Sequence, residues 1–206
     1  MTHTLHRVGD YENLKDDYVF LMMPSQDINH ENSAPKLKRF FEMALEKGAI
    51  KIGDCRSGNE YYQGGVDEVV NNVEDRAVIH AVFTDRDKVI DMLEALKEED
   101  LGMSVVLTGI VDRVNDCLKE VDIQRHTVEH SLGRWGAKEK LPPKEILEIA
   151  TMCGHAMVAV SLIRKMIKDI KDEKITPREA AEELFKPCMC GIFNVERAEK
   201  LLKEIV

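Results

Sequence analysis

The chain has 206 residues, of which 44% are hydrophobic and 33% charged, a composition typical of a folded globular protein rather than a disordered one. Its net charge of −9 provides no basic stripe to displace counterions from phosphates, so nucleic-acid binding is not expected. No run of about 18 apolar residues occurs in the sequence, so we expect no membrane-spanning helix. The first residues also lack the apolar run of a signal peptide, which favours a cytoplasmic protein.

Strands and helices are predicted to alternate in the N-terminal part of the chain. The continuous apolar run 18–23, ended by Pro24, predicts a strand that is buried on both faces. The amphipathic segment that follows predicts a helix from about 35 to 47. The same patterns predict later strands at 50–52, 77–83, 103–108 and 123–132, and later helices at 66–73, 85–98 and 110–121.

This alternation predicts the fold class. Strands joined by crossover helices form right-handed βαβ units, so we expect an α/β protein with a mostly parallel layered sheet of about five strands. A ferredoxin-like α+β arrangement is the alternative. In a parallel sheet, ligands bind beyond the carboxyl ends of the strands, which would place the loops at 24–33 and 53–65 beside a binding crevice.

A helical C-terminal region is expected after a change in composition around residues 134–143. The proline pair at 142 and 143 marks a boundary between two parts of the chain. We therefore predict an α/β domain at 1–136 and a helical region, which carries most of the cysteines, at 142–206.

Four helices are expected in this C-terminal region, at 144–150, 156–171, 177–185 and 195–205. The third has the clearest start, because Thr176 and Glu179 have the spacing of a capping box. Pro177 lies in the first turn of that helix, where proline is favoured.

Two short motifs, Cys153-Gly-His155 and Cys188-Met-Cys190, hold three of the five cysteines. In a reducing compartment these thiols are not expected to form structural disulfides. The helix expected from 156 rises about 24 Å, and the returning helix covers about 16 Å. Extended residues at 186 and 187 make up the remaining few Å. We therefore expect both motifs at the same end of a helical hairpin.

These motifs are interpreted as a metal site. Cys153, His155, Cys188 and Cys190 form a Cys₃His set, which suits zinc or an iron–sulfur cluster. The C-x-H and C-x-C spacings are tighter than a C-x₂-C knuckle, so a single ion would use one residue of each close pair. An iron–sulfur cluster has several iron atoms and would accept closely spaced cysteines. The helix expected from 156 would also favour the thiolate of Cys153 through its dipole.

The function that follows is a cytoplasmic protein with a cysteine-ligated metal site in a redox, maturation or regulatory accessory role. One alternative is a thiol enzyme or sulfur carrier that uses Cys153, Cys188 or Cys190 as the nucleophile. Another is a non-catalytic small-ligand-binding α/β module, and ordinary packing of cysteines between helices is a third. The sequence names no substrate, so enzymatic activity is left open. A small ligand or a protein is the expected partner, and apolar positions on the last helix would allow a homodimer.

The segment His126-Thr-Val-Glu-His130 matches H-x-x-E-H, a zinc hydrolase motif in which two histidines bind the metal and the glutamate activates water. The motif needs a helix, but its threonine and valine, followed by Ser-Leu-Gly, favour a strand. In a strand the two histidines would lie about 13 Å apart, too far to share one ion. We therefore expect a strand whose His130 end reaches the ligand crevice rather than a zinc hydrolase site.

Three further residues are interpreted as structural. Cys55 lies in a loop beside Arg56, which would lower the pKa of a thiol, but an ordinary loop cysteine is the simpler interpretation. Cys117 lies on the apolar face of a predicted helix and is expected in the core. His80 lies within a buried strand and is expected to be a core histidine with its hydrogen bonds satisfied.

Overall fold

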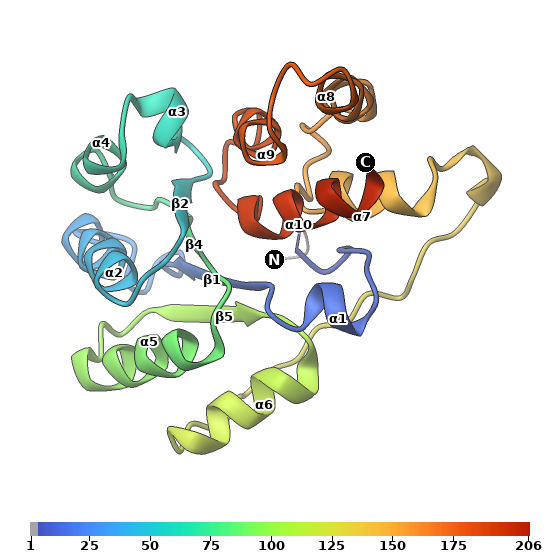
Figure 1. The fold of residues 1–206 in the computed structure, drawn as a ribbon. Coiled ribbons are helices and arrows are strands. Elements are labelled where there is room, and N and C mark those ends of the chain that lie inside the picture. The colour runs from blue at the N-terminus through green and yellow to red at the C-terminus, as the bar shows by residue number, and fades with distance from the viewer. Residues whose placement is uncertain (1–3) are drawn as a thin grey trace.

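Five strands form one sheet in the computed structural model, which describes residues 4–206 (Figure 1). Residues 1–3, at the start of the predicted α/β domain, lie outside the described residues. The strand order is β3-β2-β4-β1-β5, and every pair of neighbours is antiparallel. The strands are β1 (Tyr18–Met23), β2 (Lys51–Asp54), β3 (Gly58–Asn59), β4 (Ile79–Phe83) and β5 (Ser104–Thr108).

The expected mostly parallel sheet is wrong. Helix α2 (Ala34–Glu46) joins β1 to β2, but β4 lies between these two strands in the sheet. Helix α5 (Arg86–Glu99) joins β4 to β5, but β1 lies between them. Each of these helices connects two parallel strands that have one other strand between them in the sheet. The parallel strands of each βαβ unit are therefore not neighbours. This is the split βαβ arrangement, and the fold is α+β, in agreement with the alternative.

Helices lie on both sides of the sheet. Besides α2 and α5, the helices are α1 (Tyr11–Leu14), α3 (Glu60–Gln63), α4 (Val66–Asn71), α6 (Val111–Glu120), the 3₁₀ turn η1 (Lys138–Lys140), α7 (Lys144–Ala150), α8 (Val160–Lys171), α9 (Pro177–Phe185) and α10 (Val195–Ile205). Helices α2, α4, α5 and α6 lie on one side of the sheet, and α7 to α10 lie on the other (Figure 1).

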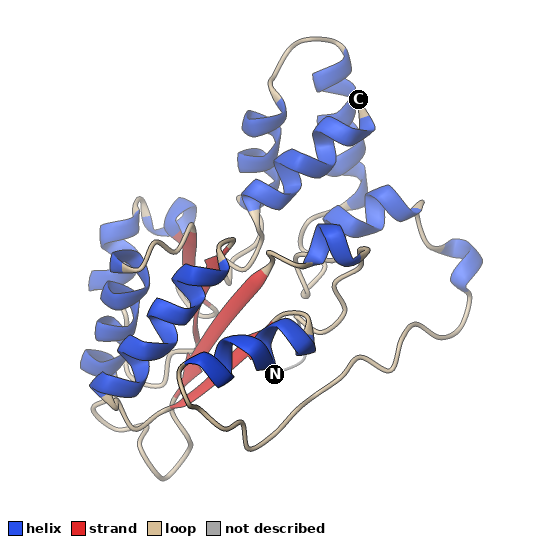
Figure 2. Ribbon diagram, turned by 60° about the horizontal axis from the view of Figure 1, so that its bottom comes forward, coloured by secondary structure: helices blue, strands red, loops and turns tan. Residues whose placement is uncertain are grey.

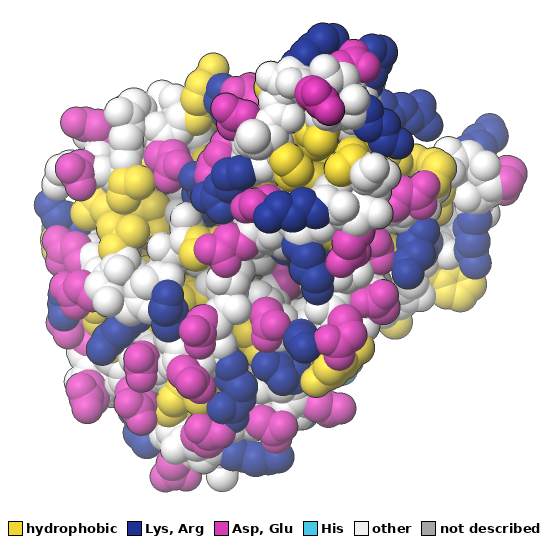
Figure 3. All heavy atoms as spheres, in the orientation of Figure 1, with side chains coloured by type: hydrophobic (Ala, Val, Ile, Leu, Met, Phe, Trp, Pro, Cys, Tyr) yellow, Lys and Arg dark blue, Asp and Glu magenta, His cyan; other side chains and the backbone are white. Residues whose placement is uncertain are grey.

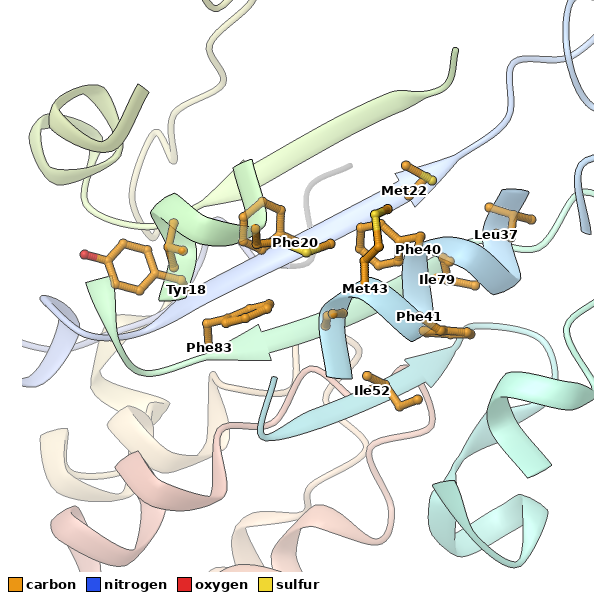
Figure 4. Close-up of a cluster of buried hydrophobic side chains, with 14 of the residues drawn as sticks. Tyr18, Phe20, Met22, Leu37, Phe40, Phe41, Met43, Ile52, Ile79 and Phe83 are labelled. Carbon is orange, nitrogen blue, oxygen red and sulfur yellow. The ribbon is translucent and has the colours of Figure 1, made fainter. Parts of the chain in front are cut away.

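Two hydrophobic cores flank the strands. In the first, Phe20 of β1 packs with α2 and α5 side chains and meets Phe83 of β4 edge to face, with ring centroids 5.3 Å apart (Figure 4). In the second, Val19 and Val82 join the sheet to apolar side chains of α7 to α10. The apolar run of β1 is therefore continuous because helices cover both faces of this strand.

The strand predicted at 123–132 does not form. In the described part of the chain, residues 123–137 contain neither helix nor strand and run along the outside of the molecule to η1 (Figure 2). Nearly all of their side chains are exposed, so no packed face stabilises an extended strand there. The helical region predicted at 142–206 follows, and the division of the chain into two domains stays a prediction.

The surface is charged and mixed in sign. Acidic and basic side chains are interspersed over the face shown in Figure 3. The net charge of −9 is therefore not gathered in a single acidic patch on that face. Among residues 4–206, no helix is both long and apolar enough to cross a membrane.

Candidate functional site

The loop that follows α9 lies directly against β2. A Cβ atom at Gly53 of β2 would lie 2.7 Å from the carbonyl of Cys190, and one at Gly191 would lie 2.3 Å from the carbonyl oxygen of Ile52. Gly191 also has a φ of +69°, a conformation that favours glycine. The two glycines therefore let this loop touch the strand, and the contact brings Cys190 next to Cys55 at the end of β2.

Asn59 holds the same loop from β3. Its buried side-chain amide donates hydrogen bonds to the carbonyl oxygens of Phe185, Lys186 and Cys188 at 3.4, 3.3 and 2.8 Å. Its side-chain oxygen accepts from the N–H of Tyr61 at 2.9 Å, so the same residue caps α3. Carbonyl groups at the C-terminal end of α9 are thereby satisfied, and Cys188 is held near the turn between β2 and β3.

Cys55 lies in that turn between β2 and β3. Asp54 is buried, and its carboxylate accepts hydrogen bonds from the N–H of Arg56 at 2.8 Å and from the hydroxyl of Ser57 at 2.9 Å. An aspartate that bonds the backbone two residues later forms an Asx turn. This turn fixes the backbone that carries Cys55.

Cys153 and His155 lie in a series of turns between α7 and α8, not at the start of a helix. The helix expected from 156 begins at Val160, because Ala156 has a φ of +56° and interrupts the helical backbone. The backbone N–H groups of His155, Met157 and Val158 in these turns help to lower the pKa of Cys153. Direct backbone donors therefore take the place of the expected helix dipole.

Arg7 joins the two cysteine-containing loops. Its guanidinium donates hydrogen bonds to the carbonyl oxygens of Met152, at 3.3 Å, and of Ile192. The same guanidinium pairs with the carboxylate of Asp17, just before β1. One cation therefore fastens the residue before Cys153 to the loop that follows α9.

Asp17 is the buried anion of this arrangement. Its side chain is 1% exposed and accepts hydrogen bonds from Asn194 at 2.9 Å and Arg197 at 3.2 Å, besides its ion pair with Arg7. Burial alone would raise the pKa of Asp17, but the charges of Arg7 and Arg197 and the hydrogen bond from Asn194 hold this pKa below its ordinary value. The carboxylate therefore stays ionised at neutral pH and orients Arg7 toward both loops.

Four cysteine side chains meet where these segments converge, and we call them the thiol cluster (Cys55, Cys153, Cys188 and Cys190). The sulfur atoms of Cys55 and Cys190 are 3.4 Å apart. Cys153 and Cys188 form a second pair, in which each thiol shifts the pKa of the other. Cys55 is half-buried and the other three are buried. Cys117 lies in the first hydrophobic core, which confirms the prediction of a core cysteine.

Two histidines contact the thiol cluster. Nδ1 of His155 lies 3.2 Å from Sγ of Cys190, and Nδ1 of His80 lies 3.9 Å from Sγ of Cys55. His80 comes from β4, the strand next to β2, and its side chain is fully buried. The prediction of a buried histidine is confirmed, and one of its neighbours is a thiol.

The pKa values separate the two members of each thiol pair. The hydrogen bond from Cys188 is the largest influence that lowers the pKa of Cys153 to about 6, against the effect of burial. The same contact, together with burial, raises the pKa of Cys188 well above its ordinary value. The contact between Cys55 and Cys190 likewise lowers the pKa of Cys55 and, with burial, raises the pKa of Cys190. Each pair therefore holds one thiol that ionises readily and one that keeps its proton.

The predicted Cys₃His set is brought together in part. Cys153 contacts Cys188, and Cys190 contacts His155. As the side chains stand, residues 4–206 contain no group of three or more His, Cys, Asp or Glu residues that could hold a metal ion. The two thiol pairs would have to close on a metal before all four sulfurs could coordinate it.

Two members of the site, Cys55 and His80, are not predicted by the sequence. Both come from the sheet, and they meet because the strand order places β2 beside β4. Gly53 was an available signal, since glycine in a strand often marks the close approach of another backbone. Gly191 is its counterpart in the loop that makes this approach.

The segment His126–His130 does not form the site that its motif suggests. It lies in the exposed irregular stretch between α6 and η1, so it forms neither the helix that H-x-x-E-H requires nor the predicted strand. Nδ1 of His126 lies 2.7 Å from the hydroxyl of Thr127. The parallel sheet on which the expected crevice was based is wrong, although β1 and β2 point the same way and the loops that follow them lie at the same edge of the sheet.

A polar hollow of about 420 Å³ opens beside the turn that carries Cys55. Its walls are formed by polar and charged side chains of Asp54, Arg56, Ser57, Gln63, Asn72 and Glu74. Several of them already bond one another, as Gln63 does with Ser57 at 3.0 Å. The hollow therefore lies beside this turn, and part of its polar lining is already engaged in hydrogen bonds.

The thiol cluster is the candidate functional site of this chain. All of its cysteines are free, and they come from three separate segments: the β2–β3 turn, the turns after α7 and the loop after α9. Comparisons of the chain with known protein families, curated proteins and solved structures found no match.

Proposed function

We propose that the thiol cluster binds a thiophilic metal, as zinc or an iron–sulfur cluster, in a cytoplasmic protein with a redox, maturation or regulatory accessory role. The observation that carries the proposal is that four free cysteines from three chain segments form two neighbouring pairs, Cys55 with Cys190 and Cys153 with Cys188. Free thiols at such short distances suit a reducing compartment such as the cytoplasm, where they are not converted to structural disulfides.

The spacing of the sulfurs supports a single zinc ion best. Two sulfurs bound to a tetrahedral zinc ion at 2.3 Å are about 3.8 Å apart. The 3.4 Å between Cys55 and Cys190 would therefore open by only about 0.4 Å on zinc binding. Cys153 and Cys188 would approach as the second pair of ligands, so the ion would use both Cys188 and Cys190, and not one residue of this pair as the spacing predicts. An iron–sulfur cluster is larger than a single ion and would require wider separation of the same sulfurs.

The surroundings of the sulfurs also support metal ligation. The backbone N–H of Phe193 lowers the pKa of Cys188, and those of His155, Met157 and Val158 lower the pKa of Cys153. Donors of this kind orient ligands and tune a metal centre. The ring nitrogens of His155 and His80 lie 3.2 and 3.9 Å from the sulfurs of Cys190 and Cys55, where they would hydrogen-bond the coordinating thiolates.

Burial of the cluster supports an accessory rather than a catalytic metal. Cys153, Cys188 and Cys190 are at most 3% exposed, so the metal would have a closed coordination shell. Closed metal sites contribute directly to folding, because they join chain segments that are otherwise separate. Here the metal would fasten the helical C-terminal region to the end of β2.

Metal analysis of protein purified without oxygen tests the proposal. We expect about one zinc per chain, or iron and sulfide with visible absorption, and a loss of metal in Cys153→Ser, Cys188→Ser and Cys190→Ser. Cys117→Ser is the matched control, because Cys117 is buried in the other core and should leave the metal in place. Folded protein that stays metal-free after incubation with zinc and after iron–sulfur reconstitution would contradict the proposal.

A thiol enzyme or sulfur carrier is the second candidate, and the lowered pKa of Cys153 favours it. With a pKa of about 6 this thiol is mostly a thiolate at neutral pH, and Cys188 beside it would act as a resolving thiol. Metal-free protein would then react with iodoacetamide at Cys153 faster than at Cys117, whose pKa is raised by burial. A metal-bound cluster predicts instead that alkylation is slow until a chelator removes the metal.

A further inference from the structure

We propose that Cys55 and Cys190 form a reversible disulfide that controls metal binding by the thiol cluster. The release of metal rests on the proposed function, whereas formation of the disulfide does not. The two sulfurs are 3.4 Å apart, and a disulfide bond of about 2.05 Å requires them to approach by about 1.4 Å. A movement of this size is within the range of side-chain rotation.

The backbone holds these two cysteines opposite each other. Gly53 and Gly191 let the loop after α9 touch β2, and the Asx turn at Asp54 fixes the segment that carries Cys55. The two cysteines are 135 positions apart in the sequence, so their contact depends on the folded structure. The disulfide is therefore expected in folded protein and not in unfolded chains.

Exposure distinguishes this pair from the pair of Cys153 and Cys188. Cys55 is half-buried, whereas the other three sulfurs of the cluster belong to residues that are at most 3% exposed. The polar hollow opens beside the turn of Cys55. An oxidant in solution therefore reaches the cluster first at Cys55, and Cys190 lies behind it in position to resolve the product.

A peroxide is the oxidant class that the reaction requires. The sulfur of Cys55 attacks one peroxide oxygen, the O–O bond breaks, and Cys55 becomes a sulfenic acid as water leaves. The sulfur of Cys190 then attacks the sulfur of Cys55, the S–O bond breaks, and the departing hydroxyl takes the thiol proton of Cys190 as a second water. The two thiols lose two electrons and two protons, and one hydrogen peroxide becomes two waters.

The disulfide removes two of the four sulfur ligands. A tetrahedral ion left with only Cys153 and Cys188 would be released, because closed zinc sites use four protein ligands. A dithiol reductant then restores both thiols by thiol–disulfide exchange, and the metal binds again. The pair of Cys55 and Cys190 is therefore a peroxide-sensitive switch on the proposed metal site.

Peptide mass spectrometry after peroxide treatment tests this inference on zinc-loaded and on chelator-treated protein. We expect a peptide pair joined through Cys55 and Cys190, its loss after dithiothreitol, and about one zinc released per disulfide in loaded protein. Cys153, Cys188 and Cys117 should remain free to react with iodoacetamide after denaturation, and Cys117 serves as the internal control. In Cys55→Ser, checked for folding by circular dichroism, Cys190 should stay a free thiol through the same treatment.

The outcomes separate the inference from the proposed function. A joined pair of Cys153 and Cys188, or irreversible oxidation of Cys55 without any disulfide, would overturn the inference. A disulfide in protein that binds no metal under any condition would support the thiol chemistry and contradict the proposed function. Bound metal that survives peroxide without a disulfide would support the proposed function and overturn the switch.

Discussion

Gly191 determines how closely the cysteine-containing loop approaches the sheet. Alanine at this position would keep a φ of +69°, which costs about 1 kcal/mol, and would place its Cβ 2.3 Å from the carbonyl oxygen of Ile52. Because such a contact forces the loop away from β2, we expect Gly191→Ala to lower the free energy of unfolding by about 2–4 kcal/mol. Urea denaturation measures this change.

Gly133→Ala is the matched control for that prediction. Gly133 has a φ of +89°, but a Cβ there would meet nothing within 4 Å. This variant should therefore lose only the conformational cost of about 1 kcal/mol. Equal losses in the two variants would contradict a close contact between the loop and β2.

Asp17 supplies a part of the stability that depends on pH. Its folded-state pKa lies below that of an unfolded aspartate, about 3.9, so the stabilisation is present above this value and is lost as the pH falls through the folded-state pKa. Asp17→Asn leaves the charges of Arg7 and Arg197 buried without a counterion. We expect the free energy of unfolding at pH 7 to fall by about 3–5 kcal/mol.

The same variant tests the sign of the pH dependence. The stability gap between the wild type and Asp17→Asn, measured by urea denaturation, should shrink steadily as the pH is lowered below about 4. Asp16→Asn is the control, because the Asp16 side chain is 48% exposed and its pair with Arg113 is worth at most about 1 kcal/mol. A gap of constant size from pH 7 to pH 2 would contradict an ionised Asp17.

Among the helices, α9 begins with the capping box that the sequence predicts at Thr176 and Glu179, and the structure confirms it. The hydroxyl oxygen of Thr176 accepts from the N–H of Glu179 at 3.2 Å, and the carboxylate of Glu179 accepts from the N–H of Thr176 at 2.7 Å. We expect Thr176→Ala to lower the free energy of unfolding by about 1 kcal/mol in chemical denaturation, whereas Thr176→Ser keeps the cap and most of the stability. A serine variant as unstable as the alanine variant would contradict the capping role.

The end of α9 depends on Asn59 in the same way. Asn59→Ala removes the donor for carbonyl oxygens at Phe185, Lys186 and Cys188, and buried groups left unsatisfied cost about 1–3 kcal/mol. Because the loop then loosens, we expect Cys188 to react faster with iodoacetamide in native protein, as followed by mass spectrometry. Asn72→Ala removes only an exposed amide contact and should leave that rate unchanged; equal rates in both variants would show that Asn59 does not hold the loop.

The hairpin of α8 and α9 shows what helix patterns predict and what they miss. The helix lengths predict that Cys153 and Cys188 are neighbours, and the structure places them together because Cys153 precedes α8 and Cys188 follows α9. The helix starts at Val160 rather than at 156, because nothing in the apolar periodicity indicates the positive φ of Ala156. The later start of α8 does not separate Cys153 from Cys188, because the residues before Val160 only lengthen the loop between α7 and α8.

For the whole molecule, the sequence predicts where the strands lie along the chain better than it predicts their order in the sheet. The apolar runs located β1, β4 and β5, but alternating strands and helices fit both a parallel sheet and split βαβ units. Pairing decides between them, and it rests on contacts between distant residues, such as Phe20 with Ala81 and Leu107 on its two sides. A single sequence does not report these pairings.

The residues of the candidate site also differ in whether the sequence predicts them. Its helical half, with Cys153 and Cys188, follows from helix lengths along a continuous stretch of chain. Its sheet half, with Cys55 and His80, exists because β2 lies beside β4 and because a glycine in β2 admits the loop after α9. Local patterns therefore predict the thiols of the C-terminal region and not the partners that the sheet supplies.

X-ray absorption spectroscopy of the zinc-loaded protein identifies the ligands of the metal, because it counts the atoms bound to the ion. The convergence of Cys55, Cys153, Cys188 and Cys190 predicts one zinc coordinated by four sulfurs at about 2.3 Å. Loss of one sulfur from this shell in Cys55→Ser would show that the sheet contributes a ligand. Zinc surrounded only by nitrogen and oxygen at about 2.0–2.2 Å, or a protein that retains no zinc, would contradict the account.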